Sequence, residues 1–280
     1  MGGPVGGNSY FPPTFRVSRA GDNVRSVTYR IGLILPSSNT AAESEAFDLV
    51  GRLADVMIHI ARVRVTTVTG DTASGRQFAP AAMVAAAELL RDAHVNVIAW
   101  AGTSGSWLGI NHERELVRVL SDVARVPATT STHALIAACR SWNVAKVALV
   151  TPYTEEIVSA ICATFASVGI EVVRERHLGI TDSFACGEVD DRTLRRSVRR
   201  VAEDEVDAVL IVCTNFAAGH LVGALEREIA VPIFDSTVAT IWRSCVIGRH
   251  WTPLGKYGVL LSSTKGTTME CKVEETTSGP

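Results

Sequence analysis

Short runs of β-branched and apolar residues alternate with longer stretches whose apolar positions recur at helical spacing. This alternation is typical of parallel sheets built from right-handed βαβ units, so the expected fold class is α/β. The pattern predicts strands over Tyr29–Leu35, Val56–Val65, Val95–Trp100, Ala145–Thr151, Ile170–Glu175, Val206–Val212 and Val231–Phe234. It predicts helices over Thr40–Ala54, Pro80–Ala93, His112–Ala124, Ser131–Ser141, Thr154–Val168, Asp191–Glu203 and Ala217–Glu228.

The chain also repeats itself in three landmarks that follow the same order in each half. The landmark pairs are Pro36 with Pro152, Gly102 with Cys213, and Val126–Ser131 with Val231–Ser236. The first two landmarks are 66 residues apart in the first half and 61 apart in the second, so spacing agrees as well as order. We therefore expect two pseudo-symmetric, flavodoxin-like halves that face each other across a cleft. Ligands of open parallel sheets bind at the carboxyl ends of strands, where every landmark falls, so the active site is expected in this cleft.

The expected domain organisation follows from these halves and from the two ends of the chain. Residues 1–26 are rich in Gly, Pro, Ser and Arg without periodicity, and residues 262–280 are polar. Both segments are expected to be flexible. We expect the first α/β half at 27–130, the second at 131–240, and a helix or strand returning to the first half at 241–261.

Charge and cysteine usage narrow the classes of function. A formal net charge of −2 gives no electrostatic reason for nucleic acid or anionic lipid as the main partner. No apolar run reaches the ~18–20 residues of a membrane span, and the N-terminus lacks the layout of a signal peptide, so a cytoplasmic location is expected. The six cysteines show no C-x-x-C spacing and the seven histidines form no ligand motif, so we expect free thiols and no metal site.

Cys213 is the cysteine whose position most strongly indicates catalysis. It follows the apolar strand Val206–Val212 and precedes a predicted helix, whose N-terminal N–H groups would stabilise its thiolate and lower its pKa. Cys186 lies in a loop-like stretch and is a second candidate for the border of the cleft. The cysteines that fall inside apolar helical patterns are expected in the core, and these are Cys139, Cys162 and Cys245.

Polar turns at the other strand ends allow a structural and a functional interpretation. The run Gly102–Ser106 fits a tight turn with a helix N-cap, and it equally fits an anion cradle of N–H groups and hydroxyls. Ser38 and Asn39 either accompany a capping box at Thr40–Glu43 or bind substrate. Tyr153 follows a strand at the cleft end, where its phenol either donates to an oxyanion or packs half-buried.

Taken together, these residues resemble the aspartate/glutamate racemase superfamily, in particular its maleate isomerase and arylmalonate decarboxylase branch, over residues 28–262. The resemblance implies two pseudo-symmetric halves, a catalytic residue from each at the cleft, and neither metal nor organic cofactor. The opening Pro36-Ser-Ser-Asn39-Thr40 looks like the maleate isomerase signature, in which the asparagine binds a substrate carboxylate. The isomerases and racemases carry a cysteine in each half, whereas this chain has Gly102 at the first-half position. The asparagine of their second-half loop is matched by Ser183.

Arylmalonate decarboxylases instead carry Gly-Thr-Ser at the first-half position, a tyrosine after the fourth strand and one second-half cysteine. The matching residues here are Gly102, Thr103, Ser104, Tyr153 and Cys213. The resemblance therefore implies a cofactor-independent decarboxylase of a substituted malonate or similar small diacid.

The resemblance also implies a mechanism for this decarboxylation. One carboxylate and the enediolate formed from it would be held by Thr103, Ser104, Tyr153 and the backbone N–H groups of Cys213 and Thr214. Cys213 would then protonate the enediolate on one face. Because the arm after the first strand is Ser37-Ser38-Asn39 rather than apolar, an acid smaller or more polar than an aryl malonate is expected.

Two alternatives stay open at this point. One is a maleate-type cis–trans isomerase or a racemase relative that uses a different nucleophile, and the other is a non-catalytic carboxylate-binding protein. A small carboxylic or dicarboxylic acid is the expected partner in every case. The sequence leaves homo-oligomer formation undecided.

Overall fold

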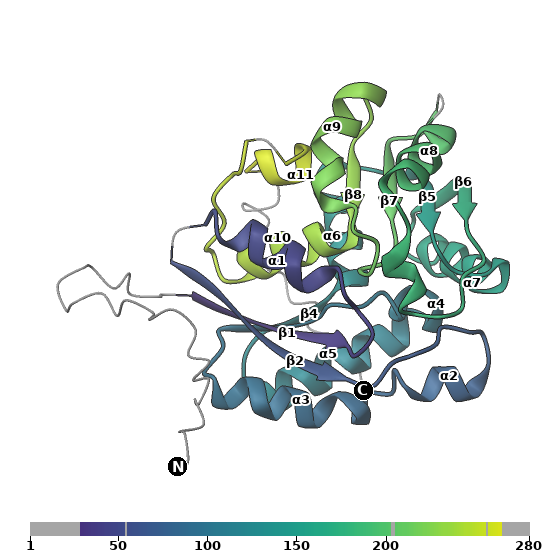
Figure 1. Ribbon diagram of the computed structural model, residues 1–280. Helices are drawn as coiled ribbons and strands as arrows, with labels where there is room; N and C mark the ends of the chain where they lie inside the picture. The colour runs from purple at the N-terminus through teal and green to yellow at the C-terminus, as the bar shows by residue number, and fades with distance from the viewer. Residues whose placement is uncertain (1–28, 54, 203–204, 256, 265–280) are drawn as a thin grey trace, which may run out of the picture.

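Two four-stranded parallel sheets, one from each half of the chain, form the framework of the protein (Figure 1). Their strand orders are β2-β1-β3-β4 and β6-β5-β7-β8. The strands are β1 (Tyr29–Pro36), β2 (Val56–Val63), β3 (Val97–Trp100), β4 (Ala128–Thr130), β5 (Lys146–Thr151), β6 (Glu171–His177), β7 (Ala208–Ile211) and β8 (Ile233–Asp235). The two orders coincide when β1 is matched to β5 and each following strand to its counterpart. The predicted α/β fold with two pseudo-symmetric halves is thus confirmed.

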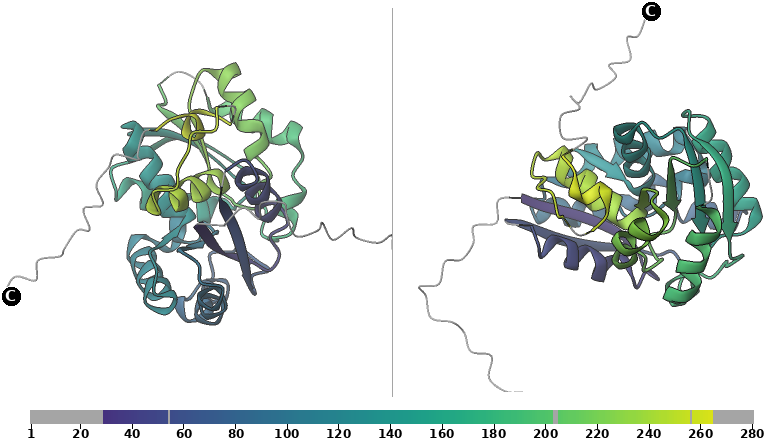
Figure 2. Two further views of the ribbon diagram at one scale, coloured as in Figure 1. Left: turned by 90° about the vertical axis from the view of Figure 1, so that its left-hand side faces the viewer. Right: turned by 90° about the horizontal axis from the view of Figure 1, so that it is seen from above.

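Helices cover both faces of each sheet (Figure 2). In the first half α3 and α5 pack together on one face, while α1 and α10 pack together on the other; in the second half α8 and α9 share a face. The helices are α1 (Ala42–Val50), α2 (Thr72–Arg76), α3 (Pro80–Asp92), α4 (Gly105–Leu108), α5 (Ile110–Ala124), α6 (Ser131–Trp142), α7 (Glu155–Ala166), the 3-10 turn η1 (Ala185–Glu188), α8 (Asp191–Val201), α9 (Gly219–Ile229), α10 (Ser236–Ile247) and α11 (Val259–Ser262). Among the described helices, none is long and apolar enough to cross a membrane.

The computed structural model describes residues 29–53, 55–202, 205–255 and 257–264. The predicted N-terminal extension at 1–26 lies outside this part of the chain, as does the predicted tail from residue 265 onward. The predicted boundary at residues 240 and 241 falls within α10, which begins directly after β8 and packs against α1 and α6.

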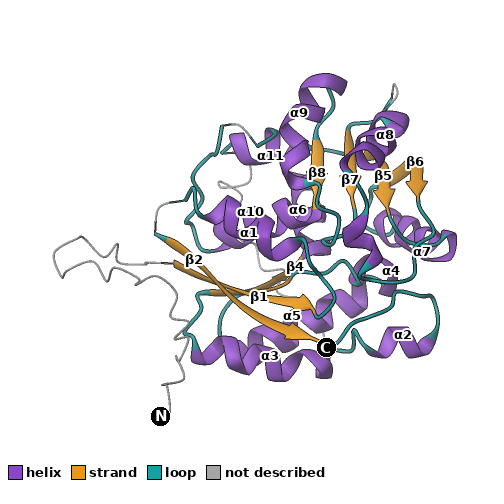
Figure 3. Cartoon of the chain, in the orientation of Figure 1, coloured by secondary structure: helices purple, strands orange, loops and turns teal. Residues whose placement is uncertain are grey.

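The central strands are buried on both faces, which explains their continuous apolar sequences. Every residue of β3 and β7 is buried, as expected for strands covered by helices on both sides. By contrast, the edge strand β6 is largely exposed and carries charged residues. The carboxyl ends of the strands in both sheets point toward the region between the halves (Figure 3).

Elements that the sequence did not predict are mostly short. Helices α2, α4 and α11 and strand β4 have three to five residues each, too few for a recognisable period. Helix α10 was predicted only in part, by the helix or strand expected at 241–261 and the helical pattern around Cys245. Nine of its 12 residues are buried, so it has no polar stripe to mark its start.

Helix α1 is capped by Asn39 and not by the predicted capping box at Thr40–Glu43. The Asn39 side-chain oxygen accepts hydrogen bonds from the N–H groups of Ala41 (3.1 Å) and Ala42 (2.9 Å). The glutamate of the expected box pairs with Arg62 on β2 and therefore does not reach back to the helix start.

A buried carboxyl group, Glu113, joins α5 to the start of α6. It accepts a hydrogen bond from the hydroxyl of Thr130, the N-cap residue of α6, and its other oxygen lies against Gly105, where an added Cβ would meet it at 1.7 Å. Burial raises the pKa of Glu113 to about 7, and the hydrogen bond from Thr130 offsets only part of that effect.

Glu113 should make the protein less stable as the pH rises. Because its folded-state pKa is raised, its favourable contribution is present below the unfolded value of 4.5 and is lost as the pH rises to about 7. We expect Glu113→Gln to gain about 3 kcal/mol of unfolding free energy relative to the wild type between pH 4 and pH 8. Urea unfolding at both pH values measures this, with Glu88→Gln on the exposed side of α3 as the control. A difference between Glu113→Gln and wild type that does not change with pH would contradict the assignment.

Candidate active site

A small cavity of about 30 Å³ lies between the two halves, beyond the carboxyl ends of β1, β3, β5 and β7. This volume is enough for about one water molecule. Eight of the nine site residues predicted from the sequence line it, namely Asn39, Gly102, Thr103, Ser104, Tyr153, Ser183, Cys213 and Thr214.

Cys213 lies buried on the turn after β7, with hydrogen-bond donors directed at its sulfur. The N–H of Asn215 is 3.4 Å from Sγ. Burial alone would raise the pKa of Cys213, but hydrogen bonds from the Cys186 thiol, the Tyr153 hydroxyl and the N–H groups of Asn215 and Phe216 outweigh it, and the pKa lies below its ordinary value. The turn therefore makes the Cys213 thiol more acidic than an ordinary cysteine.

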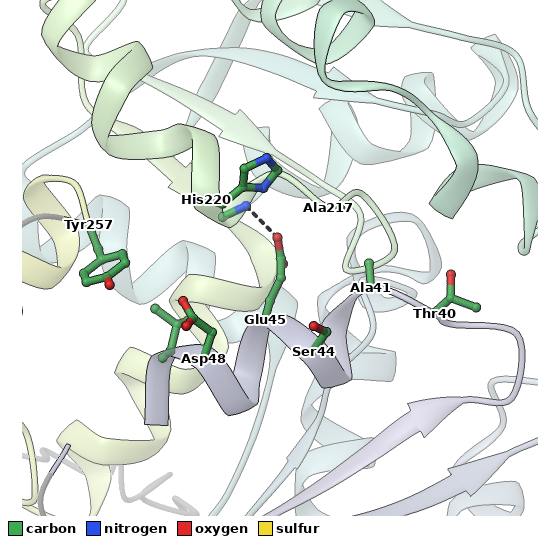
Figure 4. A pocket seen from close by; sticks show the side chains of 10 residues that line it. Thr40, Ala41, Ser44, Glu45, Asp48, Ala217, His220 and Tyr257 are labelled. Carbon is green, nitrogen blue, oxygen red and sulfur yellow. Dashed lines mark hydrogen bonds between the residues drawn. The ribbon is translucent and has the colours of Figure 1, made fainter. Parts of the chain in front are cut away.

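The sequence predicted that N–H groups at a helix N-terminus stabilise the thiolate, but the stabilising N–H groups belong to the turn after β7. Helix α9 begins only at Gly219, whose N–H donates to Glu45 Oε1 at 2.8 Å (Figure 4). The N–H of Cys213, expected to hold a substrate carboxylate, donates instead to Ser236 Oγ at 3.1 Å. The N–H groups of Gly219 and Cys213 thus both donate to side chains of the protein that hold the turn in place.

A larger groove of about 430 Å³ lies beside this scaffold, between α1 and the start of α9 (Figure 4). Its lining includes Glu45, Asp48, His220 and Tyr257. No predicted site residue lines this groove. The smaller cavity around Cys213 is therefore the candidate active site.

Tyr153 lines the cavity from the turn after β5, within an aromatic cluster. Its hydroxyl lies 2.9 Å from Thr103 Oγ1, and its ring contacts Trp107 edge to face at 5.0 Å between ring centroids. Trp107 in turn contacts Phe78 at 5.5 Å. Burial, and then the nearby Cys213, raise the pKa of Tyr153 well above its ordinary value, so the phenol stays protonated and can donate a hydrogen bond.

Thr214 and Asn39 connect the two halves at the edge of the cavity. The Thr214 hydroxyl donates to the carbonyl oxygen of Ala101 at 3.0 Å and accepts from Asn39 Nδ2 at 3.1 Å. Since the Asn39 oxygen caps α1, both ends of this side chain have partners in the protein. These two residues therefore act as braces in this structure.

Asn215 and Ser38 form a second brace. Asn215 Oδ1 accepts from the N–H of Thr40 at 2.8 Å, and its Nδ2 donates to the carbonyl oxygen of Ser183 at 2.6 Å. Ser38 is the one predicted site residue that does not line the cavity. Its hydroxyl lies 2.7 Å from the carbonyl oxygen of Val65 and 2.8 Å from the Ser183 hydroxyl, so it supports Ser183 from behind.

Sequence reasoning left several lining residues out of the site. Asn215 lies two residues after Cys213 and could have been found from that proximity in the sequence. Cys186 was predicted only as a candidate for the border of the cleft. The apolar wall had no sequence signal, and it consists of Val65, Val68, Phe78, Trp100 and Trp107. Among the described residues, no group of three His, Cys, Asp or Glu side chains is arranged to hold a metal ion.

Residues 31–255 match the arylmalonate decarboxylase family. The chain belongs to this family. A maleate isomerase from Nocardia farcinica is 30% identical over 225 residues, which cover 75% of this chain and 86% of the relative. The arylmalonate decarboxylase from Bordetella bronchiseptica is 28% identical over 149 residues, covering 52% of this chain and 62% of the relative. The crystal structure of the maleate isomerase Iso from Pseudomonas putida S16 superimposes with a TM-score of 0.77 and 27% identity, covering 84% of this chain and 98% of that one.

In this member of the arylmalonate decarboxylase family, the position of Gly102 has no room for a side chain. An added Cβ would lie 2.5 Å from ring atoms of Trp100. That indole is fully buried, and its Nε1 donates to Ser104 Oγ at 3.0 Å. The glycine that sets this chain apart from two-cysteine relatives is therefore required by packing.

Substituting Gly102 should cost stability for this reason. We expect Gly102→Ala to lower the free energy of unfolding by about 1–3 kcal/mol, because Trp100 must leave its position. The matched control is Gly75→Ala in α2, where an added Cβ meets nothing within 4 Å. Urea unfolding of both variants measures the difference. Equal stability of Gly102→Ala and the wild type would show that Trp100 can move without cost, which would contradict the packing requirement for glycine.

Proposed function

We propose that this protein is a cofactor-independent decarboxylase of a small substituted malonate or similar diacid, with Cys213 as its proton donor. The observation that carries the proposal is the asymmetry of the cavity. A thiol with a lowered pKa lies on the second-half side, while the corresponding first-half position is Gly102, closed by Trp100. A site with one thiol suits delivery of a proton to one face better than a two-base reaction.

Three hydroxyls are placed to hold the carboxylate that stays on the substrate. Thr103, Ser104 and Tyr153 all line the cavity. Because Ser104 Oγ already accepts from the Trp100 indole, its own proton is available for a substrate oxygen. Tyr153 remains protonated and can donate to the enediolate as negative charge develops there.

The departing carboxylate would face the apolar wall formed by Val65, Val68 and Phe78. Loss of hydration there favours breakage of its C–C bond, which releases carbon dioxide and leaves the electron pair in an enediolate. The Cys213 thiol then gives its proton to the α-carbon and becomes a thiolate, which the N–H of Asn215 stabilises. A proton from water restores the thiol.

A second candidate function is cis–trans isomerisation of a maleate-type acid. It is supported by the names of several relatives, which are maleate isomerases, and by the presence of two thiols, Cys186 and Cys213, in one cavity. In this reaction the Cys213 thiolate would add to the double bond, the new single bond would rotate, and elimination would return the thiolate. Asn39, the residue expected to bind a carboxylate, would first have to release Thr214.

Replacing Cys213 should abolish decarboxylation. We expect Cys213→Ala to lower kcat by about 10²–10⁴-fold on any malonate that the wild type decarboxylates, because the proton donor is lost. Carbon dioxide release from a panel of small substituted malonates measures this. Cys162→Ala, on the outer helix α7, is the matched thiol control and should keep full activity.

Two outcomes would contradict the proposal. Undiminished carbon dioxide release by Cys213→Ala would remove the thiol from the mechanism. Conversion of maleate to fumarate, followed by NMR, with no carbon dioxide from any malonate would favour the isomerase.

A further inference from the structure

Cys186 is a second thiol in the cavity of Cys213, and the proposed decarboxylation does not use it. It lies in the 3-10 turn η1 and is 2% exposed. Its Sγ donates to the carbonyl oxygen of Asp182 at 3.4 Å. Cys186 and Cys213 line the same cavity, whose volume of about 30 Å³ leaves room for about one water molecule.

The backbone around Cys186 fixes the place of its sulfur. Asp182 forms an isolated bridge with Thr67 of the first half, and the N–H of Ser183 donates to the carbonyl oxygen of Thr66 at 3.0 Å. The Asp182 carboxylate accepts from the N–H of Ala185 at 2.8 Å, which closes the start of the turn. The segment is thus tied to the first half while its thiol faces the second-half cysteine.

We propose that Cys186 is a positioning residue that makes Cys213 a stronger acid by donating its S–H to the sulfur of Cys213 when that sulfur gives up its proton. The inference rests on the proposed role of Cys213 as proton donor. Cys186 matches no residue of the family pattern found in the sequence, so this role is additional to that pattern.

The S–H proton of Cys186 has two possible acceptors, the carbonyl oxygen of Asp182 and the sulfur of Cys213. While Cys213 is a thiol, the carbonyl oxygen of Asp182 is the better acceptor for the Cys186 S–H. Once Cys213 becomes a thiolate, its charge makes it the stronger acceptor, and rotation of one side-chain bond redirects the proton. The charge on the thiolate is then shared by the Cys186 S–H, the Tyr153 O–H and the N–H of Asn215.

Cys186 itself keeps its proton in this arrangement. Its hydrogen bond to Cys213, followed by burial, raises the pKa of the Cys186 thiol above its ordinary range. The two thiols therefore have different tasks, since Cys213 exchanges a proton with the substrate and Cys186 holds one throughout.

The test is the pH dependence with which iodoacetamide alkylates Cys213 in the full chain, because only the thiolate reacts. Tryptic peptides 201–227 and 177–192 carry Cys213 and Cys186 respectively, each as its only cysteine, so mass spectrometry follows each thiol separately. We expect Cys186→Ala to raise the midpoint for Cys213 by about one pH unit, since one donor to the thiolate is lost. Cys186→Ser, which keeps an O–H donor, should shift it by less than half as much, and Cys162→Ala should leave it unchanged.

The kcat values of the Cys186 variants should change in the same order as their alkylation midpoints. At neutral pH we expect Cys186→Ala to lower kcat for a malonate by roughly three- to tenfold, with KM nearly unchanged and Cys186→Ser in between. An unchanged alkylation midpoint in Cys186→Ala would overturn the proposal, as would equal shifts in the Ala and Ser variants. Alkylation needs no substrate, so the Cys213 midpoint can be measured even if the protein decarboxylates no malonate. Failure of the decarboxylase proposal can therefore be distinguished from failure of the role proposed for Cys186.

Discussion

The side chain of Asn215 holds the turn that carries Cys213 against the first half, and the candidate site depends on this contact. Its oxygen accepts from the N–H of Thr40, its nitrogen donates to the carbonyl oxygen of Ser183, and its own N–H points at the Cys213 sulfur. This residue therefore contributes both to the contact between the halves and to the environment of the thiol. Movement of either half would change the acidity of Cys213 directly.

The two halves share a scaffold but have diverged at the strand ends. Trp100 ends β3 at the place where Ile211 ends β7, and the indole fills the space that a side chain at position 102 would need. The first half thus supplies the hydroxyls of Thr103 and Ser104 and an apolar wall, whereas the second supplies the thiol, its N–H donors and the Tyr153 phenol. A duplicated fold has become a site with different chemistry on its two sides, as the proposed one-sided protonation requires.

The sequence predicted the fold and half of the residues that line the cavity, because both depend on local signals. Strand ends in a parallel sheet meet at one edge, so the polar turns at Gly102, Tyr153 and Cys213 could be placed together from strand order alone. The missed features depend on contacts between distant segments. Cys186 reaches the cavity only because its segment bridges to Thr67, and Phe78 joins the wall from the segment before α3. The source of thiolate stabilisation was misplaced because α9 begins at Gly219, two residues later than its pattern indicated.

The most direct measurement of the central claim is the decarboxylation of a prochiral disubstituted malonate in D₂O, with chiral separation and mass analysis of the product. A single thiol that protonates one face predicts one enantiomer, carrying one deuterium on its α-carbon, with no further exchange on prolonged incubation. A racemic product, or a product whose α-hydrogen continues to exchange in the presence of the enzyme, would contradict the one-sided site.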